Sequence, residues 1–245
     1  MHLFFEWASL LNEEGNTTLL VLSEHNSTQL IVTATYEDNS SEDVTQEAIY
    51  SSNDNVVDVN KGMISTNKEG SAVVTVSYGG KTSTLQVEVY EMIEGHLLPH
   101  EPANPDATLL GVDENDNGVR DEVERWIYKD MSTYHHPEIE RVIAMQQAKA
   151  YQLNLSDRNN TDDIPITLVN KAIDCWDYYI ELKNIPFDVA YKEMSRYLVK
   201  LQDIVFNTKE RLKAYRLFNQ NLGIRVFTDI PSNVTNCETN IDLMK

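Results

Sequence analysis

The sequence predicts a multidomain protein in which an all-β domain is followed by an all-α helical bundle. Three observations lead to this prediction. Apolar residues alternate with Thr, Ser or Gln in the first third of the chain, as in half-buried strands. After residue 137 they recur every three or four positions, as in amphipathic helices. The length of 245 residues also exceeds the usual size of one domain.

The strands are predicted from three segments: "STQLIVTATY" at 27–36, "GSAVVTVSY" at 70–78 and "TSTLQVEVY" at 82–90. Gly79 and Gly80 lie between the last two, and a two-residue glycine loop is typical of a tight β-hairpin. Residues 1–16 fit neither pattern and are assigned to a separate N-terminal segment. This segment lacks a basic start and a small-residue cleavage site, so it is not predicted to be a signal peptide.

The first third of the chain also carries a recognisable series of residues. An aromatic residue, a Ser-Ser pair, a Val-x-Val and two glycines follow in order, and these are Tyr50, Ser51, Ser52, Val57, Val59, Gly62 and Gly70. Over residues 17–90 this series resembles the group 2 bacterial immunoglobulin-like domain, although Trp is commoner than Tyr at the aromatic position. The resemblance implies an Ig-like β-sandwich over residues 17–92. It also implies a stalk, spacer or adhesive module of a secreted or surface protein, without catalytic residues.

Residues 93–112 contain three prolines and no sustained periodicity, which predicts a linker. The helical domain is predicted over residues 121–245 and belongs to no family that we recognise. A short helix should follow residue 121, and longer helices are expected near 137–155, 165–183, 187–206 and 208–222. Thr208 is the predicted N-cap of the last helix. Apolar spacing assigns Phe187, Tyr191 and Leu212 to buried helix faces.

The charge is strongly negative, because 39 acidic residues face 20 basic ones. Residues 1–95 contain 15 acidic and only 3 basic residues. Such a surface repels the phosphates of nucleic acids and anionic membranes, so nucleic-acid binding is not expected. The chain contains no run of about 18 apolar residues, so membrane insertion is not expected either.

A dense acidic stretch, "DENDNGVRDEVE", lies at residues 113–124. Numbered as a twelve-residue loop, it agrees with the EF-hand pattern at every informative position, with Gly118 at the sixth. Calcium is a hard cation that binds six to eight oxygen atoms. The predicted calcium ligands are Asp113, Asn115, Asn117, the carbonyl of Val119, Asp121 through a water molecule, and both oxygens of Glu124.

The remaining acidic residues of the stretch, Glu114, Asp116 and Glu122, are expected to face solvent. In an alternative interpretation the stretch is an acidic surface loop without an ion. Asp121 then caps the following helix, and Glu124 completes a capping box.

The segment before the loop, "PHEPANPDATLLG", cannot form a regular helix, and no second loop follows. The stretch therefore resembles the lone calcium loops of extracellular bacterial proteins, such as dockerin-like repeats, more than a paired EF-hand. This resemblance implies a structural ion at the domain junction. We expect the ion to fix the end of the linker and the start of the helix after residue 121, and so to set the angle between the domains.

Cys175 and Cys237 are the two cysteines. Their wide spacing, without a CxxC, argues against a zinc site and leaves a disulfide or two free thiols. A disulfide is the expectation in an oxidising compartment.

Neither HExxH nor GxSxG occurs, and neither cysteine lies in a recognisable nucleophile motif, so catalysis is not expected. The sequence favours a secreted or cell-surface, calcium-stabilised binding or adhesion protein. Its partner would be a protein or glycan on a surface, or copies of itself. One alternative is a structural subunit of an extracellular filament or virion assembly. The other is an enzyme with an unrecognised site in the helical domain.

Overall fold

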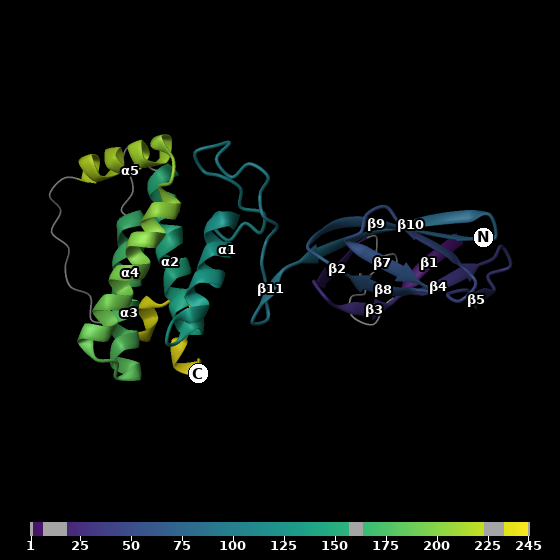
Figure 1. Cartoon of the computed structure of the whole chain (residues 1–245), viewed down its shortest axis with the longest axis horizontal. Coiled ribbons are helices and arrows are strands. Elements are labelled where there is room, and N and C mark those ends of the chain that lie inside the picture. Colours follow the sequence, from purple (N-terminus) through teal and green to yellow (C-terminus); the bar gives the residue numbers. More distant parts are fainter. Residues whose placement is uncertain (1, 7–18, 157–163, 223–232, 245) are drawn as a thin grey trace. The chain divides into compact units, whose positions relative to one another are not determined.

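The computed structural model describes residues 2–6, 19–156, 164–222 and 233–244. Its internal contacts divide the chain into two compact units, Met1–His100 and Glu101–Lys245. The first unit is built from strands and the second from helices (Figure 1). The predicted order of a β-rich region followed by a helical region is therefore confirmed. Among the described helices, none is long and apolar enough to cross a membrane.

Within the described part of the first unit, the strands form three sheets and a small two-stranded ribbon. The sheets have the orders β2-β10-β9-β6, β3-β8-β7 and β1-β4-β5, and the ribbon is β11-β12. Within the first sheet, β10 runs antiparallel to β9 and parallel to β2. The bounds are β1 His2–Glu6, β2 Leu19–Ser23, β3 Ser27–Gln29, β4 Ile31–Thr35, β5 Ser41–Asp43, β6 Ile49–Ser52, β7 Val57–Asn60, β8 Met63–Thr66, β9 Gly70–Tyr78, β10 Lys81–Tyr90, β11 Met92–Ile93 and β12 His96–Leu97.

The two longest strands form the predicted hairpin. Gly79 and Gly80 connect them with φ angles of 55° and 75°, the left-handed values that a tight two-residue turn requires. Alternate residues of both strands are buried, as the period of two predicted. They join residues of the other sheets in one hydrophobic core. The buried positions of the hairpin are Ala72, Val74, Val76, Leu85, Val87 and Val89.

The first unit extends beyond the segment predicted to be a domain on both sides. Strand β1 pairs antiparallel with β4. This pairing was not predicted, because "HLFFE" lacks polar alternation. At the other end, β11 and β12 lie within and beside the predicted linker. The ring of His100 stacks on Tyr90 at 4.3 Å, and its Nε2 lies 3.0 Å from the carbonyl oxygen of Val89. Residues up to 100 therefore belong to the β unit.

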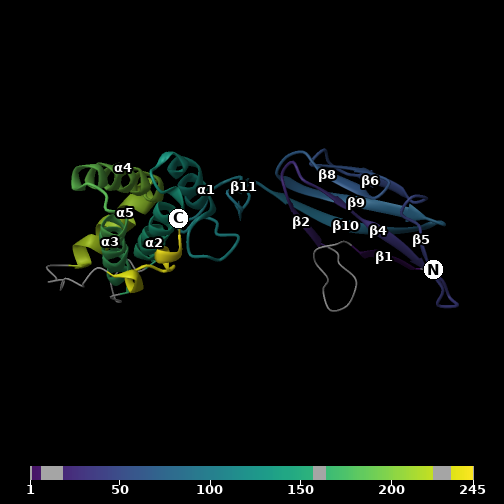
Figure 2. The same cartoon turned by 90° about the horizontal axis from the view of Figure 1, so that it is seen from below.

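The described residues of the second unit form five α-helices, each within a few residues of its predicted position. The central helix α2 packs against α1, α3, α4 and α5, and Figure 2 shows this bundle from a second direction. Proline is the first residue of α2, and the N–H of Arg211 donates to Thr208 Oγ1 at 3.1 Å, which confirms the predicted cap of α5. The bounds are α1 Asp121–Asp130, α2 Pro137–Ser156, α3 Ile164–Lys183, α4 Phe187–Val205 and α5 Lys209–Leu222, with short 3₁₀ helices at Met131–Thr133, Val234–Asn236 and Ile241–Leu243.

Three apolar residues do not lie where helical spacing placed them. Phe187 is 78% exposed, Tyr191 is 58% exposed and Leu212 is 37% exposed. Periodicity identifies residues that share a helix face, but it does not show how far the neighbouring helices cover that face. Helix α5 lies across one end of the bundle (Figure 1) and buries Arg211, Ala214 and Phe218 instead.

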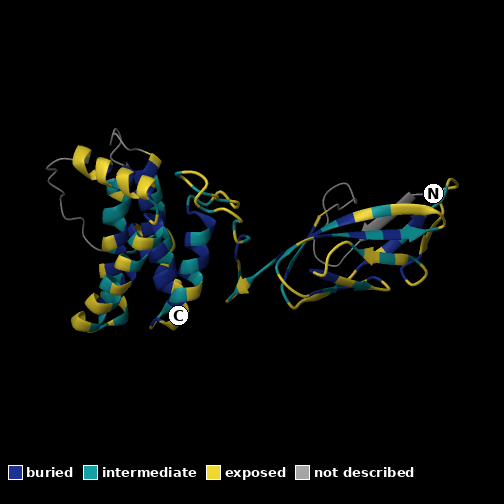
Figure 3. Ribbon diagram, turned by 45° about the horizontal axis from the view of Figure 1, so that its top comes forward, coloured by how far each residue is buried: buried dark blue, intermediate teal, exposed yellow. Residues whose placement is uncertain are grey.

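Cys175 on α3 and Cys237 in the C-terminal segment form a disulfide, as expected, across 62 residues of sequence. The side chain of Gln146 on α2 holds the same segment by two hydrogen bonds. Its Nε2 donates to the carbonyl of Asn236 at 2.8 Å, and its Oε1 accepts the N–H of Glu238 at 3.1 Å. The C-terminal segment is therefore attached to both α2 and α3, and Figure 3 shows the buried faces of these helices in dark blue.

Candidate calcium loop and the buried arginines beside it

The backbone of residues 113–118 folds around the side chain of Asp113. Its Oδ1 accepts the N–H of Asn117 at 3.1 Å, and its Oδ2 accepts the N–H of Gly118 at 2.9 Å. Gly118 has a φ of 87° and Asp116 a φ of 53°, so the chain turns sharply at both residues. A left-handed φ costs glycine little, which is the reason for glycine at the sixth position of such a loop.

Four of the predicted ligands converge on one place. The side-chain amides of Asn115 and Asn117 donate to Glu124 Oε2 at 3.0 and 2.8 Å. Glu124 is fully buried on α1, and Asn117 is bonded to Asp113 through its backbone. The amide oxygens of Asn115 and Asn117 accept the N–H groups of Asn117 and Val119 at 3.3 and 2.8 Å. Each amide would have to turn away from this bond to offer its oxygen to a cation beside Glu124. The donor set therefore suits a hard cation.

The other two predicted ligands lie at the start of α1. Val119 is 2% exposed and its side chain packs in the core of the helical unit, as predicted. Asp121 is 1% exposed, and its Oδ1 accepts the N–H of Glu114 at 2.9 Å. Burial, aided by the charges of Glu114, Asp113 and Glu124, raises the pKa of Asp121 to about 6.

The capping roles that the alternative interpretation gave to Asp121 and Glu124 are wrong. The N-cap residue of α1 is Arg120, and no side chain makes a cap hydrogen bond there. Asp121 is already the first helical residue, and its carboxylate turns back to the loop. Glu124 accepts hydrogen bonds from the side chains of Asn115 and Asn117. The carboxylates of Asp121 and Glu124 therefore bind residues of the loop and do not cap the helix.

Glu114 and Asp116 are exposed, as expected, whereas the prediction for Glu122 is wrong. Its side chain is only 14% exposed, and its Oε1 lies 2.6 Å from Arg120 Nε and 3.7 Å from Arg211 Nη1. Two buried guanidinium groups hold this carboxylate out of solvent, because a buried cation needs an anionic partner nearby.

Arg120, the eighth residue of the loop, connects it to the end of α4. Its guanidinium donates to the carbonyls of Ile204 and Val205 at 3.0 and 3.2 Å, and to Gln152 at 3.0 Å. The carbonyls in the last turn of a helix have no partner within the helix, and the helix dipole favours a cation there. Arg120 is fully buried, so these bonds are shielded from water.

Arg211 on α5 holds the segment that enters the loop. It is fully buried and donates to the carbonyls of Pro105, Thr108 and Leu109 at 2.7 to 3.1 Å. It also pairs with Asp106 at 2.6 Å. These bonds fix the path of residues 105–109 in place of the entering helix of an EF-hand.

Arg120 and Arg211 were not identified from the sequence, because an isolated arginine in an acidic chain is usually a solvated surface residue. One indirect signal is Gly111, whose φ is 74°. A Cβ atom at this position would lie 2.1 Å from the Cδ atom of Arg120. The glycine is therefore required where the incoming segment passes against the buried arginine.

Within the described ranges, no three His, Cys, Asp or Glu side chains gather closely enough to hold a metal ion by themselves. Asp113, Asp121 and Glu124 therefore do not form such a cluster on their own. They would supply charged oxygen to an ion, and amide and carbonyl oxygens of the loop would supply the rest. This mixture is typical of calcium sites and unlike the nitrogen and sulfur ligands of zinc.

A second group of titratable side chains lies inside the helical bundle. Glu140 on α2 is fully buried, and its Oε1 accepts the hydroxyl of Tyr179 at 2.7 Å. Its Oε2 has no hydrogen-bond partner among the described residues. Glu193 on α4 pairs with His135 close by. Burial, together with the charge of Glu193, raises the pKa of Glu140 to about 7, although the bond from Tyr179 opposes this shift.

The raised pKa of Glu140 makes the stability of the bundle depend on pH. Between about 4.5 and 7 the folded chain keeps a proton that the unfolded chain has lost. The contribution of Glu140 to the free energy of unfolding is therefore largest below pH 4.5 and is lost as the pH rises to about 7. Relative to the Glu140→Gln variant, the parent should lose up to roughly 3 kcal/mol across this window. Urea unfolding at several pH values measures the difference.

The exposed neighbour Glu138 provides the control for this prediction. Glu138→Gln removes one carboxylate from the same turn of α2 without changing a buried group. Its stability should follow the parent at every pH. A constant difference between parent and Glu140→Gln across the window would contradict the assignment.

Comparison with known proteins assigns the chain to no family. No protein-family model matches the chain, and no curated protein matches it.

Proposed function

We propose that the loop at residues 113–124 binds a structural calcium ion that stabilises the helical unit of a secreted or cell-surface binding protein. The proposal rests mainly on one observation: Asp113, Asn115, Asn117 and Glu124 are joined by hydrogen bonds within the loop. Glu124 is fully buried there. A buried carboxylate close to other carboxylates is costly unless a cation accompanies it.

The chemistry of the ion would be electrostatic. Calcium would bring two positive charges to the three carboxylates of Asp113, Asp121 and Glu124 and relieve their mutual repulsion. Val119 and Arg120 belong to the same loop and contact the core and the end of α4. Holding the loop closed would therefore also hold α1 and α4, which is the role of a structural ion rather than of a sensor.

Two further observations support an extracellular setting. The disulfide between Cys175 and Cys237 is of a kind that persists in oxidising compartments. The β unit combines a sandwich-like core shared by three sheets with the residue series of the bacterial Ig-like domain, including Gly62 and Gly70 at φ angles of 79° and 137°. In this proposal the β unit is a spacer or adhesive module, and the helical unit contacts a protein or glycan without catalysis.

The proposal predicts calcium binding that depends on the loop. Titration of the full chain with calcium in a calorimeter should show one site. Glu124→Ala should weaken binding most because it removes two oxygens, and Asp113→Ala should also weaken it, each by about tenfold or more, since a lost charged contact costs over 1.4 kcal/mol.

Asp116→Ala is the matched control, because Asp116 is exposed and occupies a non-ligand position of the same loop. It should lower affinity only slightly, through the weaker local charge. If the parent gives no heat of binding, or if Asp116→Ala weakens binding as much as Glu124→Ala, the calcium site is rejected.

A further inference from the structure

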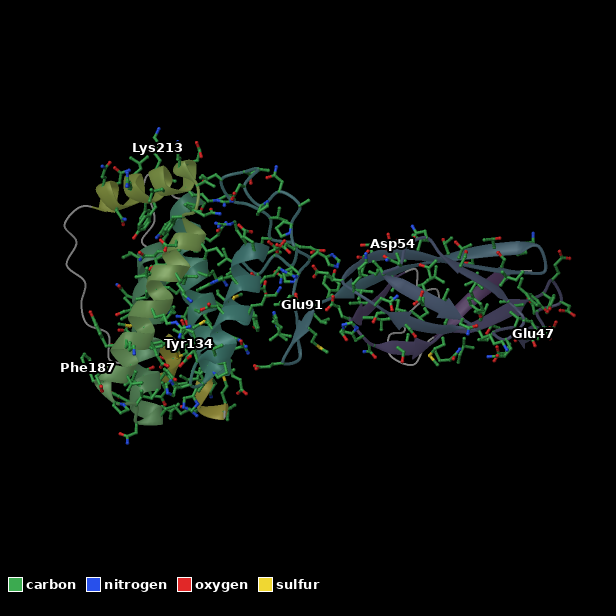
Figure 4. The ribbon with its side chains drawn as sticks, in the orientation of Figure 1. Glu47, Asp54, Glu91, Tyr134, Phe187 and Lys213 are labelled. Atoms are coloured by element: carbon green, nitrogen blue, oxygen red, sulfur yellow. A yellow bond between two sulfur atoms is a disulfide. The ribbon has the colours of Figure 1, made fainter. Side chains whose placement is uncertain are left out.

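The outer face of α5 carries a group of positive charges on a protein with a strongly negative net charge. A hollow of about 370 Å³ on this face is lined by Lys209, Leu212, Lys213, Arg216, Leu217 and Gln220. Leu212 and Leu217 are 37% and 38% exposed. Among the residues that the structure describes, none forms an ion pair with the three cations of this face. Figure 4 labels Lys213 on the outer side of α5.

The spacing of these residues makes a continuous strip. Lys209, Lys213 and Arg216 lie four and three positions apart, so they project from the same side of the helix. The two leucines flank them, and the buried residues Arg211, Ala214 and Phe218 occupy the opposite side. We call this strip, with its three cations and two leucines, the basic face. It suits an anionic surface that also exposes an apolar side chain.

The β unit presents a surface of that kind. Five acidic residues and no basic one lie between residues 37 and 47, and all five are exposed; they are Glu37, Asp38, Glu42, Asp43 and Glu47. Burial, followed by the charges of Asp43 and Glu47, raises the pKa of Tyr50 to about 12, so both carboxylates lie near this phenol. Ile49, between Glu47 and Tyr50, is 73% exposed on β6. We call this set, with Ile49, the acidic end.

The acidic end also lies at strands that can accept a neighbour. Strand β6 is at the edge of the sheet β2-β10-β9-β6, and β5 is at the edge of β1-β4-β5. Native edge strands often carry charge that prevents pairing with another strand, and Glu42, Asp43 and Glu47 provide such charge here. A cationic helix can approach this edge where a second acidic strand would be repelled.

We propose that the basic face of one copy of the chain binds the acidic end of a second copy, so that copies associate head to tail. Charge complementarity selects this partner, because the β unit as a whole has 15 acidic and 3 basic residues. The leucines of one surface and Ile49 of the other would supply the apolar contact. The two surfaces are different, so the contact is heterologous and can join many copies into an open filament. The proposal does not depend on calcium.

The association is tested on the full-length, disulfide-bonded chain by sedimentation velocity over a wide range of concentrations. At low salt the mass should rise above that of one 28.0 kDa chain as the concentration increases. Added salt should return it to one chain, because exposed charge pairs are screened within about 10 Å at 0.1 M salt. A mass of one chain at every concentration overturns the proposal. If such a chain instead binds phosphatidylserine vesicles through α5, the basic face belongs to a membrane surface.

Charge reversal identifies the two surfaces. Lys213→Glu with Arg216→Glu makes the basic face negative, because only Lys209 remains against two carboxylates. Glu37→Lys, Glu42→Lys and Glu47→Lys together make the acidic end positive, because three cations then face Asp38 and Asp43. Each multiple variant alone should associate at least about tenfold more weakly than the parent, as rim charge pairs of an interface do when their signs are made equal. Mixing the two variants should restore association, because each then meets a partner of opposite charge.

The mixture distinguishes a lost contact from a damaged fold, since misfolded variants cannot restore each other. Lys192→Glu, which reverses an exposed lysine on α4 outside the basic face, is the matched control and should associate like the parent. The proposal is overturned if the mixture fails to associate while both variants keep the circular dichroism of the parent. It is also overturned if Lys192→Glu weakens association as strongly as the variants of α5.

Discussion

Replacement of Arg120 by Met should destabilise the helical unit by about 3–5 kcal/mol, the usual cost of removing one partner from a buried charge pair. The side chain is fully buried and satisfies the carbonyls of Ile204 and Val205 at the end of α4. Without it, the carboxylate of Glu122 would lose its 2.6 Å partner. Urea unfolding, monitored by the circular dichroism of the helices, measures the loss in the free energy of unfolding.

Lys192→Met is the matched control, because it replaces an exposed cation of α4 with the same apolar side chain. Its free energy of unfolding should stay within about 0.5 kcal/mol of the parent. A second variant, Arg120→Met with Glu122→Met, removes both charges and should recover part of the loss. If Arg120→Met is as stable as the control, Arg120 does not connect the loop to α4 as described.

Removal of the disulfide should have an effect of similar size. The bond joins residues 62 positions apart, and closing a loop of this length lowers the entropy of the unfolded chain by an amount worth on the order of 4 kcal/mol. Cys175→Ala with Cys237→Ala should therefore lower the free energy of unfolding by that amount. Alanine is the better replacement at Cys175, because this position is fully buried and serine would add an unpaired hydroxyl.

Reductant provides the control for the disulfide. It should destabilise the parent to nearly the same extent as the double substitution and should leave the double variant unchanged. The hydrogen bonds from Gln146 to the C-terminal segment should form in both the reduced parent and the double variant, since neither change removes a partner of these bonds. Equal stability of the parent with and without reductant would contradict a stabilising bond.

The helices and the hairpin could be predicted because their signals are local. Pro137 and Thr208 mark the starts of α2 and α5 in the sequence itself, and Gly79-Gly80 specifies a turn with positive φ angles. The meeting of Asp113, Asn115, Asn117 and Glu124 could be predicted because their spacing around Gly118 is fixed by the loop pattern. Each of these features depends on residues only a few positions apart.

The features that were missed depend on contacts distant in sequence. The bond between Arg120 and Ile204 joins residues 84 positions apart, and no local pattern distinguishes a buried arginine from a solvated one. The position of Glu122 follows from Arg120 and Arg211 and was mispredicted for the same reason. The exposure of Phe187 depends equally on which elements cover α4, which periodicity does not encode.

Residual stability without calcium also follows from these distant contacts. Arg120 and Arg211 hold the ends of the loop through protein groups alone, so the helical unit should remain folded in chelator. An ion should then add stability, because its binding to the folded chain exceeds its binding to the unfolded chain. At calcium concentrations about a hundred times the dissociation constant, this addition is about 2.7 kcal/mol.

The thermal midpoint of the full chain, measured by circular dichroism in saturating calcium and in excess chelator, tests the central claim most directly. A structural ion predicts a midpoint several degrees higher in calcium, on the order of 5 °C or more for the addition above. The Glu124→Ala variant should lose this difference, and Asp116→Ala should keep it. The same midpoint for the parent in calcium and in chelator would contradict a structural calcium ion at residues 113–124.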